Sequence, residues 1–230
     1  MKLACITPGL VDYTAALAWQ QTLVEQRIAA EIPDSLVLLE HPPVFTLGRG
    51  GDERYLLNPG QVPVHRVGRG GEVTFHGPGQ LVGYPILDLK QNGKDVHRYL
   101  RLLEDVVIAT LAAWGIAATR RDGLTGVWVG TDKIASIGIG VRRWVTFHGF
   151  ALNVNTELSY FSAIVPCGLP GVRMTSMQQL LKEELPLDTV QSTLVRSFAR
   201  TFGHQEIVWN TSLQAPVLKP LPTERLATVP

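Results

Sequence analysis

The stretch RGGEVTFHGPGQ (residues 69–80) constrains the fold of this chain more than any other segment. Five of its twelve residues are glycine or proline. The segment therefore contributes few core-forming side chains, and its glycines lose much conformational entropy when the chain becomes ordered. Glycine lets a backbone approach a ligand closely and exposes its N–H groups. His76 precedes the tight turn Gly77-Pro78-Gly79, which would hold the imidazole at a strand end. The alternative is a glycine-rich hairpin whose histidine is only hydrogen-bonded.

These glycines do not match the common nucleotide-binding patterns. A dinucleotide fingerprint needs G-x-G-x-x-G leading into a helix, whereas strand-like sequence follows both GRGGEV and GIGVRR. A P-loop motif is absent from the sequence. The histidines and Cys167 show none of the H-x3-H, H-E-x-x-H or C-x-x-C spacings of metal sites, so no metal and no other cofactor is predicted. The opening stretch is therefore expected to contact another kind of ligand.

Composition describes an ordinary globular protein. The 230 residues fit one large domain or two small ones, and 45% apolar against 18% charged residues argues against disorder. The net charge of +1 provides no overall basic field for nucleic acid or membrane. We expect a cytoplasmic protein, because the sequence has only two cysteines, no signal-peptide pattern and no apolar run of about 18 residues. Arginines gather at 49–69, 120–121 and 142–143, as either a solvated surface or a docking face for an acidic partner.

Hydrophobic periodicity predicts helices and strands in alternation. Helices are expected at residues 12–31, 95–114, 176–183 and 189–202. Asp12 would cap the first, and capping boxes, Thr175 with Gln178 and Asp188 with Gln191, would open the last two. Strands are expected at 35–40, 62–67, 72–76, 81–89 and, as antiparallel segments turning near 130–132, between 125 and 154. The pattern indicates an α+β (α/β) fold with a mixed β-sheet flanked by helices.

Cys167 and Lys133 are the side chains best suited to nucleophilic chemistry. Cys167 lies in the loop IVPCGLPG, framed by proline and glycine, where its sulfur can be exposed and held. Lys133 opens an apolar strand, and an ammonium near a thiol stabilises the thiolate. Together they would be a minimal nucleophile and proton-shuttle pair. The alternatives are an inert, packed cysteine and a lysine whose ammonium reaches solvent.

Three segments taken together resemble one family of enzymes. RGGEVTFHGPGQLVGYPIL, GVWVGTDKIASIGIGVRRWVTFHGFALNVN and PCGLPGVRMTSM are similar, in order and approximate spacing, to the lipoyl(octanoyl) transferases, the octanoyl-[acyl carrier protein]:protein N-octanoyltransferases. The resemblance runs from about residue 15 to residue 202. It implies the catalytic-domain fold shared with lipoate and biotin protein ligases. We therefore expect a single acyltransferase catalytic domain over 1–203 and a proline-containing tail over 204–230.

The resemblance also implies roles for individual residues. Cys167 would accept the octanoyl group as a thioester, Lys133 would activate the thiol and act as acid or base, and His76 would assist near the thioester end. The acyl site would be lined by Arg69, Gly70, Gly71, Glu72, Val73, Thr74, Phe75, His76, Ser136, Ile137, Gly138, Gly149, Phe150 and Ala151. Burial of about six methylenes and a methyl there would contribute up to roughly 5–6 kcal/mol before ordering costs.

The expected partners follow from the same resemblance. Octanoyl-acyl carrier protein would be the donor, and lipoyl domains of 2-oxoacid dehydrogenases or the H protein of the glycine cleavage system would be acceptors. No nucleic acid, membrane or cofactor is expected. Two rival hypotheses are an ATP-dependent lipoate or biotin protein ligase, which needs no nucleophilic cysteine, and a non-catalytic module that binds acylated proteins.

Overall fold

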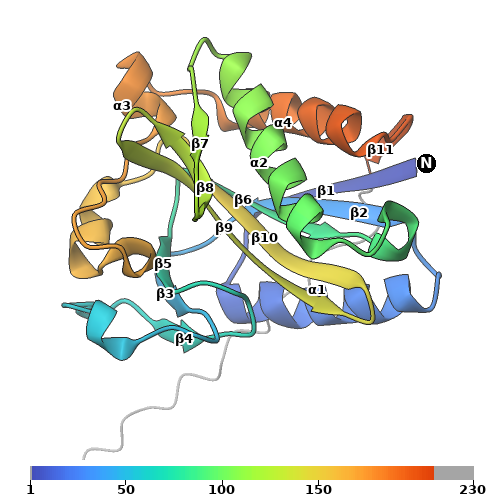
Figure 1. The fold of residues 1–230 in the computed structure, drawn as a ribbon, viewed down its shortest axis with the longest axis horizontal. Coiled ribbons are helices and arrows are strands. Elements are labelled where there is room, and N and C mark those ends of the chain that lie inside the picture. Colours follow the sequence, from blue (N-terminus) through green and yellow to red (C-terminus); the bar gives the residue numbers. More distant parts are fainter. Residues whose placement is uncertain (1, 210–230) are drawn as a thin grey trace, which may run out of the picture.

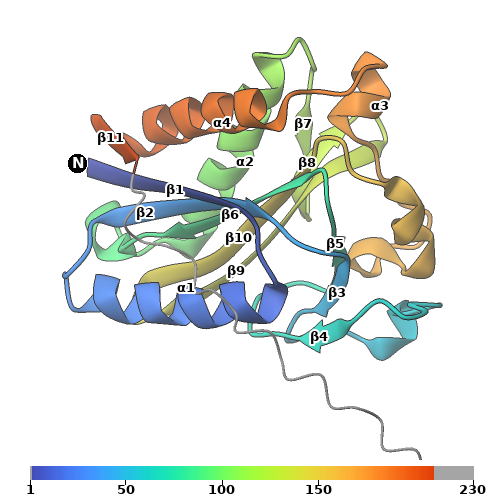
Figure 2. The ribbon, with the colours of Figure 1, turned by 180° about the vertical axis from the view of Figure 1, so that it is seen from behind.

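The computed structural model describes residues 2–209, which form two β-sheets (Figures 1 and 2). The main sheet has the order β11-β1-β2-β6-β10-β9-β8-β7. Its strands are β1 Lys2–Leu10, β2 Asp34–Glu40, β6 Gln80–Ile86, β7 Thr119–Arg121, β8 Leu124–Val129, β9 Asp132–Arg142, β10 Val145–Asn153 and β11 Glu206–Trp209. The small sheet, in the order β4-β3-β5, comprises β3 Val44–Leu47, β4 Val64–Arg66 and β5 Val73–His76. The main sheet is mixed, because β1 pairs in parallel with β2 and β11 while the other pairs are antiparallel.

Helices cover both faces of the main sheet (Figures 1 and 2). They are α1 Tyr13–Ile28, α2 Val96–Ala112, α3 Met177–Leu181 and α4 Leu187–Phe202. Short 3-10 turns occur at Glu53–Tyr55, Leu89–Asn92, Leu158–Ala163 and Pro166–Gly168. The predicted mixed sheet flanked by helices is confirmed. Within residues 2–209, none of these helices has the length and apolar character that a bilayer crossing requires.

Two apolar cores lie on opposite faces of the main sheet. The larger is formed where α2 and α4 pack against the sheet, and it includes Leu38, Leu103 and Phe198, all without measurable exposure. The smaller is formed where α1 packs against the other face, with Trp19 and Leu23 of that helix as members. Burial on both faces explains the nearly continuous apolar sequence of β2, because such a strand has no solvent face.

The helix caps follow the sequence signals only in part. Asp12 caps α1 as predicted, accepting a hydrogen bond from the Ala15 N–H at 3.1 Å. The two predicted capping boxes are wrong. Ser176, not Thr175, caps α3. Both N–H groups of the predicted box are taken by other partners, since the Thr175 N–H donates to the Lys133 carbonyl and the Gln178 N–H to the Val154 carbonyl, each at 2.9 Å. Helix α4 begins directly after Pro186, which places Asp188 inside its first turn.

Strands β1, β3, β7 and β11 were not predicted, and the expected catalytic domain over 1–203 stays a prediction. Residues Glu206–Trp209 pair in parallel with β1 at the sheet edge, beyond the boundary expected after residue 203. Four residues are too few to show a sheet periodicity of their own, so a neighbouring strand decides their conformation. The rest of the expected tail, residues 210–230 with its prolines, lies outside the described residues.

A buried ion pair joins the end of α1 to β2 and supplies the first testable prediction. Arg27 Nε donates to Asp34 Oδ1 at 2.8 Å, and the two side chains are 8% and 3% exposed. Asp34→Asn leaves the buried guanidinium without its counter-charge, so we expect it to lower the free energy of unfolding by about 3–5 kcal/mol. Urea denaturation at pH 7 measures this loss. The control is Glu25→Gln, which breaks the exposed pair with Arg142 and should change it by at most about 1 kcal/mol. Equal losses in the two variants would contradict the prediction.

Candidate active site

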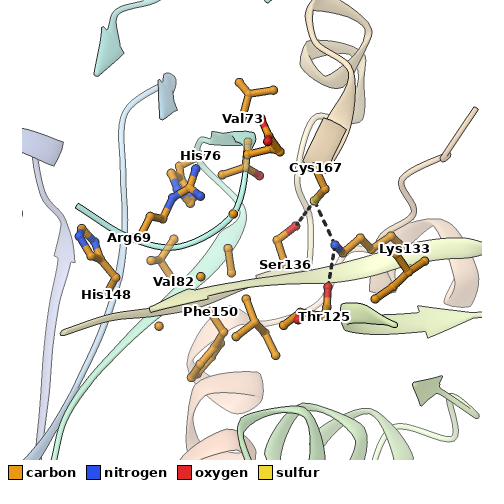
Figure 3. A pocket seen from close by; sticks show the side chains of 18 of the residues that line it. Arg69, Val73, His76, Val82, Thr125, Lys133, Ser136, His148, Phe150 and Cys167 are labelled. Carbon is orange, nitrogen blue, oxygen red and sulfur yellow. Dashed lines mark hydrogen bonds between the residues drawn. The ribbon is translucent and has the colours of Figure 1, made fainter. Parts of the chain in front are cut away.

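Cys167 lies in a short turn with an unusual backbone. Its φ of 58° and ψ of 19° are left-handed, a region that residues with a Cβ enter rarely and that is enriched at functional sites. The next residue, Gly168, also has a positive φ of 65°, and a Cβ there would approach Glu72 and Tyr55 side-chain atoms at 2.9 Å. The surrounding side chains therefore hold the turn in one conformation, with the half-buried thiol facing a cavity (Figure 3).

Lys133 places its ammonium beside this thiol. Lys133 Nζ donates to Cys167 Sγ at 3.0 Å and to the carbonyl oxygen of Thr125 at 3.0 Å (Figure 3). The side chain is only 2% exposed. The chain after Cys167 returns to β9, where the Lys133 N–H donates to the carbonyl of Arg173 at 2.9 Å. This backbone pairing brings two side chains that are 34 positions apart into contact.

Gly126 provides the space that the Lys133 side chain occupies. It has a φ of 132°, and a Cβ at this position would lie 2.5 Å from Lys133 Cε and 2.8 Å from the carbonyl oxygen of Ala135. We expect Gly126→Ala to destabilise the fold by about 1–3 kcal/mol through overpacking. Displacement of the ammonium should also slow the acyl transfer that the resemblance implies, by at least about tenfold. Thermal unfolding and a transfer assay measure the two effects.

Gly115→Ala is the matched control for this variant. Gly115 has a positive φ of 73°, but a Cβ there would have nothing within 4 Å, so alanine carries backbone strain without a clash. It should lose stability and keep its transfer rate. A Gly126→Ala enzyme as fast as this control would show that the glycine does not position Lys133.

The thiol opens on a cavity of about 220 Å³ that is bordered by both sheets and by the start of α1. Most residues expected to line the acyl site border it: Arg69, Gly71, Glu72, Val73, Thr74, His76, Ser136, Ile137, Gly138, Gly149, Phe150 and Ala151. Gly70 and Phe75 are not among its lining residues. The Phe75 ring stacks on Tyr160 at 4.5 Å within the small core beside β5, and the Gly70 N–H donates to the carbonyl of Ile139 at 2.8 Å. Val73 and Phe75 share one face of β5 and both belong to that core, but of the two only Val73 also borders the cavity.

The sequence analysis missed several residues that also border the cavity. They are Tyr13, Val82, Tyr84, Gly123, Leu124, Thr125, His148 and Leu169. Val82 and Tyr84 are two positions apart on β6 and so point to the same face, a signal present in the sequence. Nothing in the sequence indicates Tyr13, which comes from α1 and reaches the cavity only because that helix packs under the sheet.

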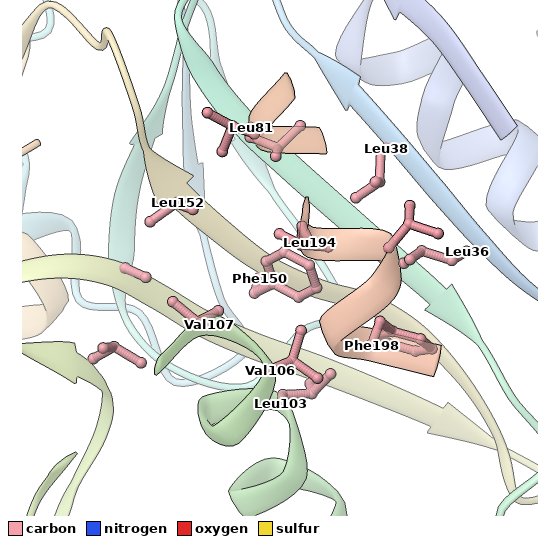
Figure 4. Packing of buried hydrophobic residues seen from close by; sticks show 14 of the residues in the cluster. Leu36, Leu38, Leu81, Leu103, Val106, Val107, Phe150, Leu152, Leu194 and Phe198 are labelled. Atoms are coloured by element: carbon pink, nitrogen blue, oxygen red, sulfur yellow. The ribbon is translucent and has the colours of Figure 1, made fainter. Parts of the chain in front are cut away.

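Phe150 connects the cavity to the larger core. It borders the cavity in Figure 3, and its ring lies among Val106, Leu194 and other core side chains in Figure 4. A Cβ on Gly83 of β6 would lie 2.2 Å from this ring, so the glycine is what allows the ring to lie across the strand. The cavity wall is therefore backed by packed core and not by solvent.

His76 borders the cavity and is held by neighbours other than the cysteine–lysine pair. Gln80 donates through its amide nitrogen to Phe75 and Asn153, so its oxygen accepts from His76 Nδ1 at 2.8 Å. The other ring nitrogen lies 3.4 Å from the Thr46 hydroxyl. Burial, with the neighbouring His41, lowers the pKa of His76 to about 3, which makes the ring neutral at pH 7. Its catalytic role stays a prediction, and its contacts suit a wall residue fixed in one tautomer.

Arg69 is buried beside the same cavity, so it does not belong to a surface cluster of arginines. Its Nη2 donates to the Thr46 carbonyl at 2.7 Å and its Nη1 to the Gly70 carbonyl at 3.0 Å. Among the described residues no carboxylate pairs with it, and Nε has no partner. Burial lowers the pKa of this guanidinium below its ordinary value. Arg69 is therefore not part of the docking face for an acidic partner that was one interpretation of the arginines at 49–69.

His41, whose ring lies next to that of His76, contacts other protein groups through both ring nitrogens. His41 contacts the Val11 carbonyl and the Tyr84 hydroxyl, each at 2.6 Å, and burial lowers its pKa to about 4. Over residues 2–209, no three or more His, Cys, Asp or Glu side chains gather as a metal ion would require.

Comparisons with known proteins agree with this fold and this site. Residues 12–199 match the model of the lipoyl protein ligase A/B catalytic domain, and the chain belongs to that family. More narrowly, it is 50% identical over 190 residues to the octanoyltransferase of Geobacter metallireducens, covering 83% of this chain and 89% of that protein. It is 52% identical over 202 residues to the octanoyltransferase of Gloeobacter violaceus, covering 87% and 90%. The resemblance to the octanoyltransferases is thereby confirmed.

Solved structures of lower identity support the fold alone. LipL1 of Plasmodium falciparum in complex with lipoate has a TM-score of 0.70 at 12% identity, covering 93% of this chain and 67% of that one. The bipartite lipoate protein ligase of Thermoplasma acidophilum has a TM-score of 0.64 at 18% identity, covering 91% and 84%. The biotin protein ligase of Aquifex aeolicus has a TM-score of 0.56 at 12% identity, covering 88% and 71%. The expected fold, that of the lipoate and biotin protein ligase catalytic domains, is confirmed.

Proposed function

We propose that this protein transfers an octanoyl group from acyl carrier protein to the lysine of a lipoyl domain, through a thioester on Cys167. The observation that carries the proposal is the 3.0 Å contact between Lys133 Nζ and Cys167 Sγ at one end of the cavity. An ammonium at hydrogen-bond distance stabilises a thiolate, which is the nucleophilic form of cysteine. Relatives about 50% identical carry the name octanoyltransferase, which supports the choice of acyl group.

In the first transfer, the Cys167 thiolate attacks the carbonyl carbon of the octanoyl thioester. The carbon–sulfur bond to phosphopantetheine breaks, and the departing thiolate takes a proton from the Lys133 ammonium. Backbone N–H groups can stabilise the negative charge of a tetrahedral intermediate, but two candidates are already in use. The Gly168 N–H donates to the Val165 carbonyl and the Gly79 N–H to the Glu40 carboxylate. The Lys133 cation is therefore the group that we assign to the negative charge of the tetrahedral intermediate. One thioester replaces another, so this step needs no ATP.

In the second transfer, the amine of the lipoyl-domain lysine attacks the carbonyl carbon of the enzyme thioester. The neutral Lys133 left by the first step accepts a proton from that amine, and the Cys167 thiolate leaves. An amide forms at the expense of a thioester, which makes the step downhill. Lys133 returns to its ammonium form and the pair is ready for another cycle.

A second hollow, beside the Cys167 turn, offers a place where two large substrates could dock in turn. This hollow of about 570 Å³ shares Leu169 with the cavity and includes the exposed side chain of Leu57. We propose that acyl carrier protein and a lipoyl domain, including that of the glycine cleavage H protein, approach there.

The arginine clusters offer less support for docking of an acidic partner, since Arg54, Arg66, Arg120 and Arg142 already pair with carboxylates of this chain. Both cysteines are free, as suits the reducing cytoplasm in which we place the reaction.

Incubation with octanoyl-acyl carrier protein, without ATP, followed by intact-mass measurement tests the proposal. The expected result is a gain of one octanoyl group that hydroxylamine removes, followed by transfer to an added lipoyl domain. Transfer that appears only with ATP and free octanoate would identify a ligase instead. Binding without transfer under either condition would leave the non-catalytic module as the better explanation.

A further inference from the structure

His148 has a backbone conformation that does not belong to a regular strand. It lies inside β10, yet its φ of 53° is left-handed, which a residue with a Cβ adopts only at a cost in free energy. The side chain is buried and borders the cavity. Figure 3 shows it at the opposite end of the lining residues from Cys167 and Lys133. Strain held at a cavity wall is a feature of functional positions.

The backbone of His148 is anchored, but one nitrogen of its ring, Nε2, makes no hydrogen bond to the described residues. The His148 N–H donates to Gln20 Oε1 of α1 at 2.8 Å, which anchors the strained residue. Among the described residues, no group hydrogen-bonds to its buried Nε2 atom. Burial, followed by the charges of Arg69 and Arg49, lowers the pKa of the ring to about 3, so the imidazole is neutral at pH 7. A neutral ring whose Nε2 atom makes no hydrogen bond presents a surface that an apolar chain end can contact.

Strand register places His148 about one octanoyl chain away from the thiol. Ser136 Oγ lies 3.9 Å from Cys167 Sγ. His148 is opposite Ile139, three residues further along β9. At about 3.4 Å per residue, those three residues span roughly 10 Å. An extended eight-carbon chain with bonds of about 1.5 Å spans roughly 9 Å. The eighth carbon of an acyl group on Cys167 would therefore arrive beside His148.

Tyr84 and Tyr13, two other large side chains that border the cavity, are held by partners of their own. The Tyr84 hydroxyl is bound to His41 at 2.6 Å. Tyr13 stacks against His76 and His65, with ring centroids at 6.0 and 5.7 Å. His148 borders the cavity as well, but among the described residues no hydrogen bond holds its Nε2 atom.

We propose that His148 closes the far end of the cavity and limits the acyl chain to eight carbons. The inference rests on the proposed octanoyl transfer and adds the residue that sets its chain length. A longer chain would have to displace the buried imidazole, whereas a shorter one would leave the end of the cavity unfilled.

His148→Gly tests the proposal, because glycine adopts the positive φ without strain and removes the ring. The measurement is kcat/KM with hexanoyl, octanoyl, decanoyl and dodecanoyl thioesters of acyl carrier protein, together with the mass of each acyl adduct. Each newly buried methylene corresponds to about fourfold in binding, and decanoyl has two more than octanoyl, so the decanoyl-to-octanoyl ratio should rise about sixteenfold over wild type. His148→Asn, which also tolerates a left-handed backbone but has a shorter side chain, should give a smaller rise and serves if the glycine variant does not fold.

Ser136→Ala is the matched control at the opposite end of the cavity. It should change the transfer rate and leave the order of chain lengths unchanged. An active wild type, with both folded His148 variants still preferring octanoyl by the wild-type ratio, would overturn the assignment of His148. A wild type that transfers no acyl group at all would instead overturn the proposed function, and this inference with it.

Discussion

Replacing Cys167 by serine is expected to reduce octanoyl transfer by at least about a thousandfold, because a hydroxyl at that position stays protonated and is a poor nucleophile. The octanoyl adduct seen by intact mass should disappear at the same time. The side chain is half-buried and the replacement is nearly isosteric, so the thermal midpoint should change little. A single-turnover assay with octanoyl-acyl carrier protein and a lipoyl domain measures the loss.

Cys5→Ala is the control for this variant. Burial raises the pKa of the Cys5 thiol to about 12, so it is neutral at pH 7 and lies within the larger core. We expect transfer by Cys5→Ala to remain within about twofold of wild type, since an inert core thiol takes no part in the chemistry. Should Cys167→Ser keep more than about a tenth of the wild-type rate, no thioester on Cys167 is required.

Replacing Lys133 by methionine is expected to slow transfer by about a hundredfold to ten-thousandfold, the range for loss of a positioned acid or base. Methionine keeps the unbranched shape of the lysine stem while removing the ammonium. Alkylation of Cys167 by iodoacetamide at pH 7 should slow as well, because the sulfur loses the cation at 3.0 Å.

The stability of the same variant separates a chemical role of Lys133 from a structural one. No carboxylate of the described residues pairs with Lys133, so methionine removes a buried charge without leaving a carboxylate uncompensated. The free energy of unfolding should stay the same or rise. Lys90→Met, at an exposed position, should keep the wild-type rate. A Lys133→Met enzyme that loses activity only in proportion to a loss of folded protein would contradict a role in proton transfer.

Local signals predicted the elements whose stability comes from their own residues. The Asp12 cap and the apolar face of residues 12–31 are such signals, and α1 forms there. The turn near Gly130 and Thr131 also appears as predicted, between β8 and β9. Errors arose where a distant segment competes with the local signal. Thr175 carries a capping sequence, yet its N–H is taken by Lys133, and the cap moves to the next residue.

The candidate site was predictable as a set of residue types and not as an arrangement. The motifs include Lys133, Cys167 and most of the cavity wall. They give no indication that Phe75 faces a separate core, or that His76 is bonded to Gln80. These outcomes depend on which way a short strand is turned by its partners, and a shift of one residue would reverse every side chain.

The sequence by itself determined the chemistry available to this protein: a cysteine in a proline-glycine turn, a lysine in an apolar strand, and glycines where backbones approach closely. Only the tertiary structure decided that the lysine and the cysteine touch, since the contact depends on pairing between residues 173–175 and β9. It also decided the left-handed backbone of His148 and the edge strand β11. The physical reason is the separation along the chain of the groups that interact. Caps and turns are set by groups a few residues apart, whereas strand pairing and burial are selected by segments that meet only when the whole sheet has formed.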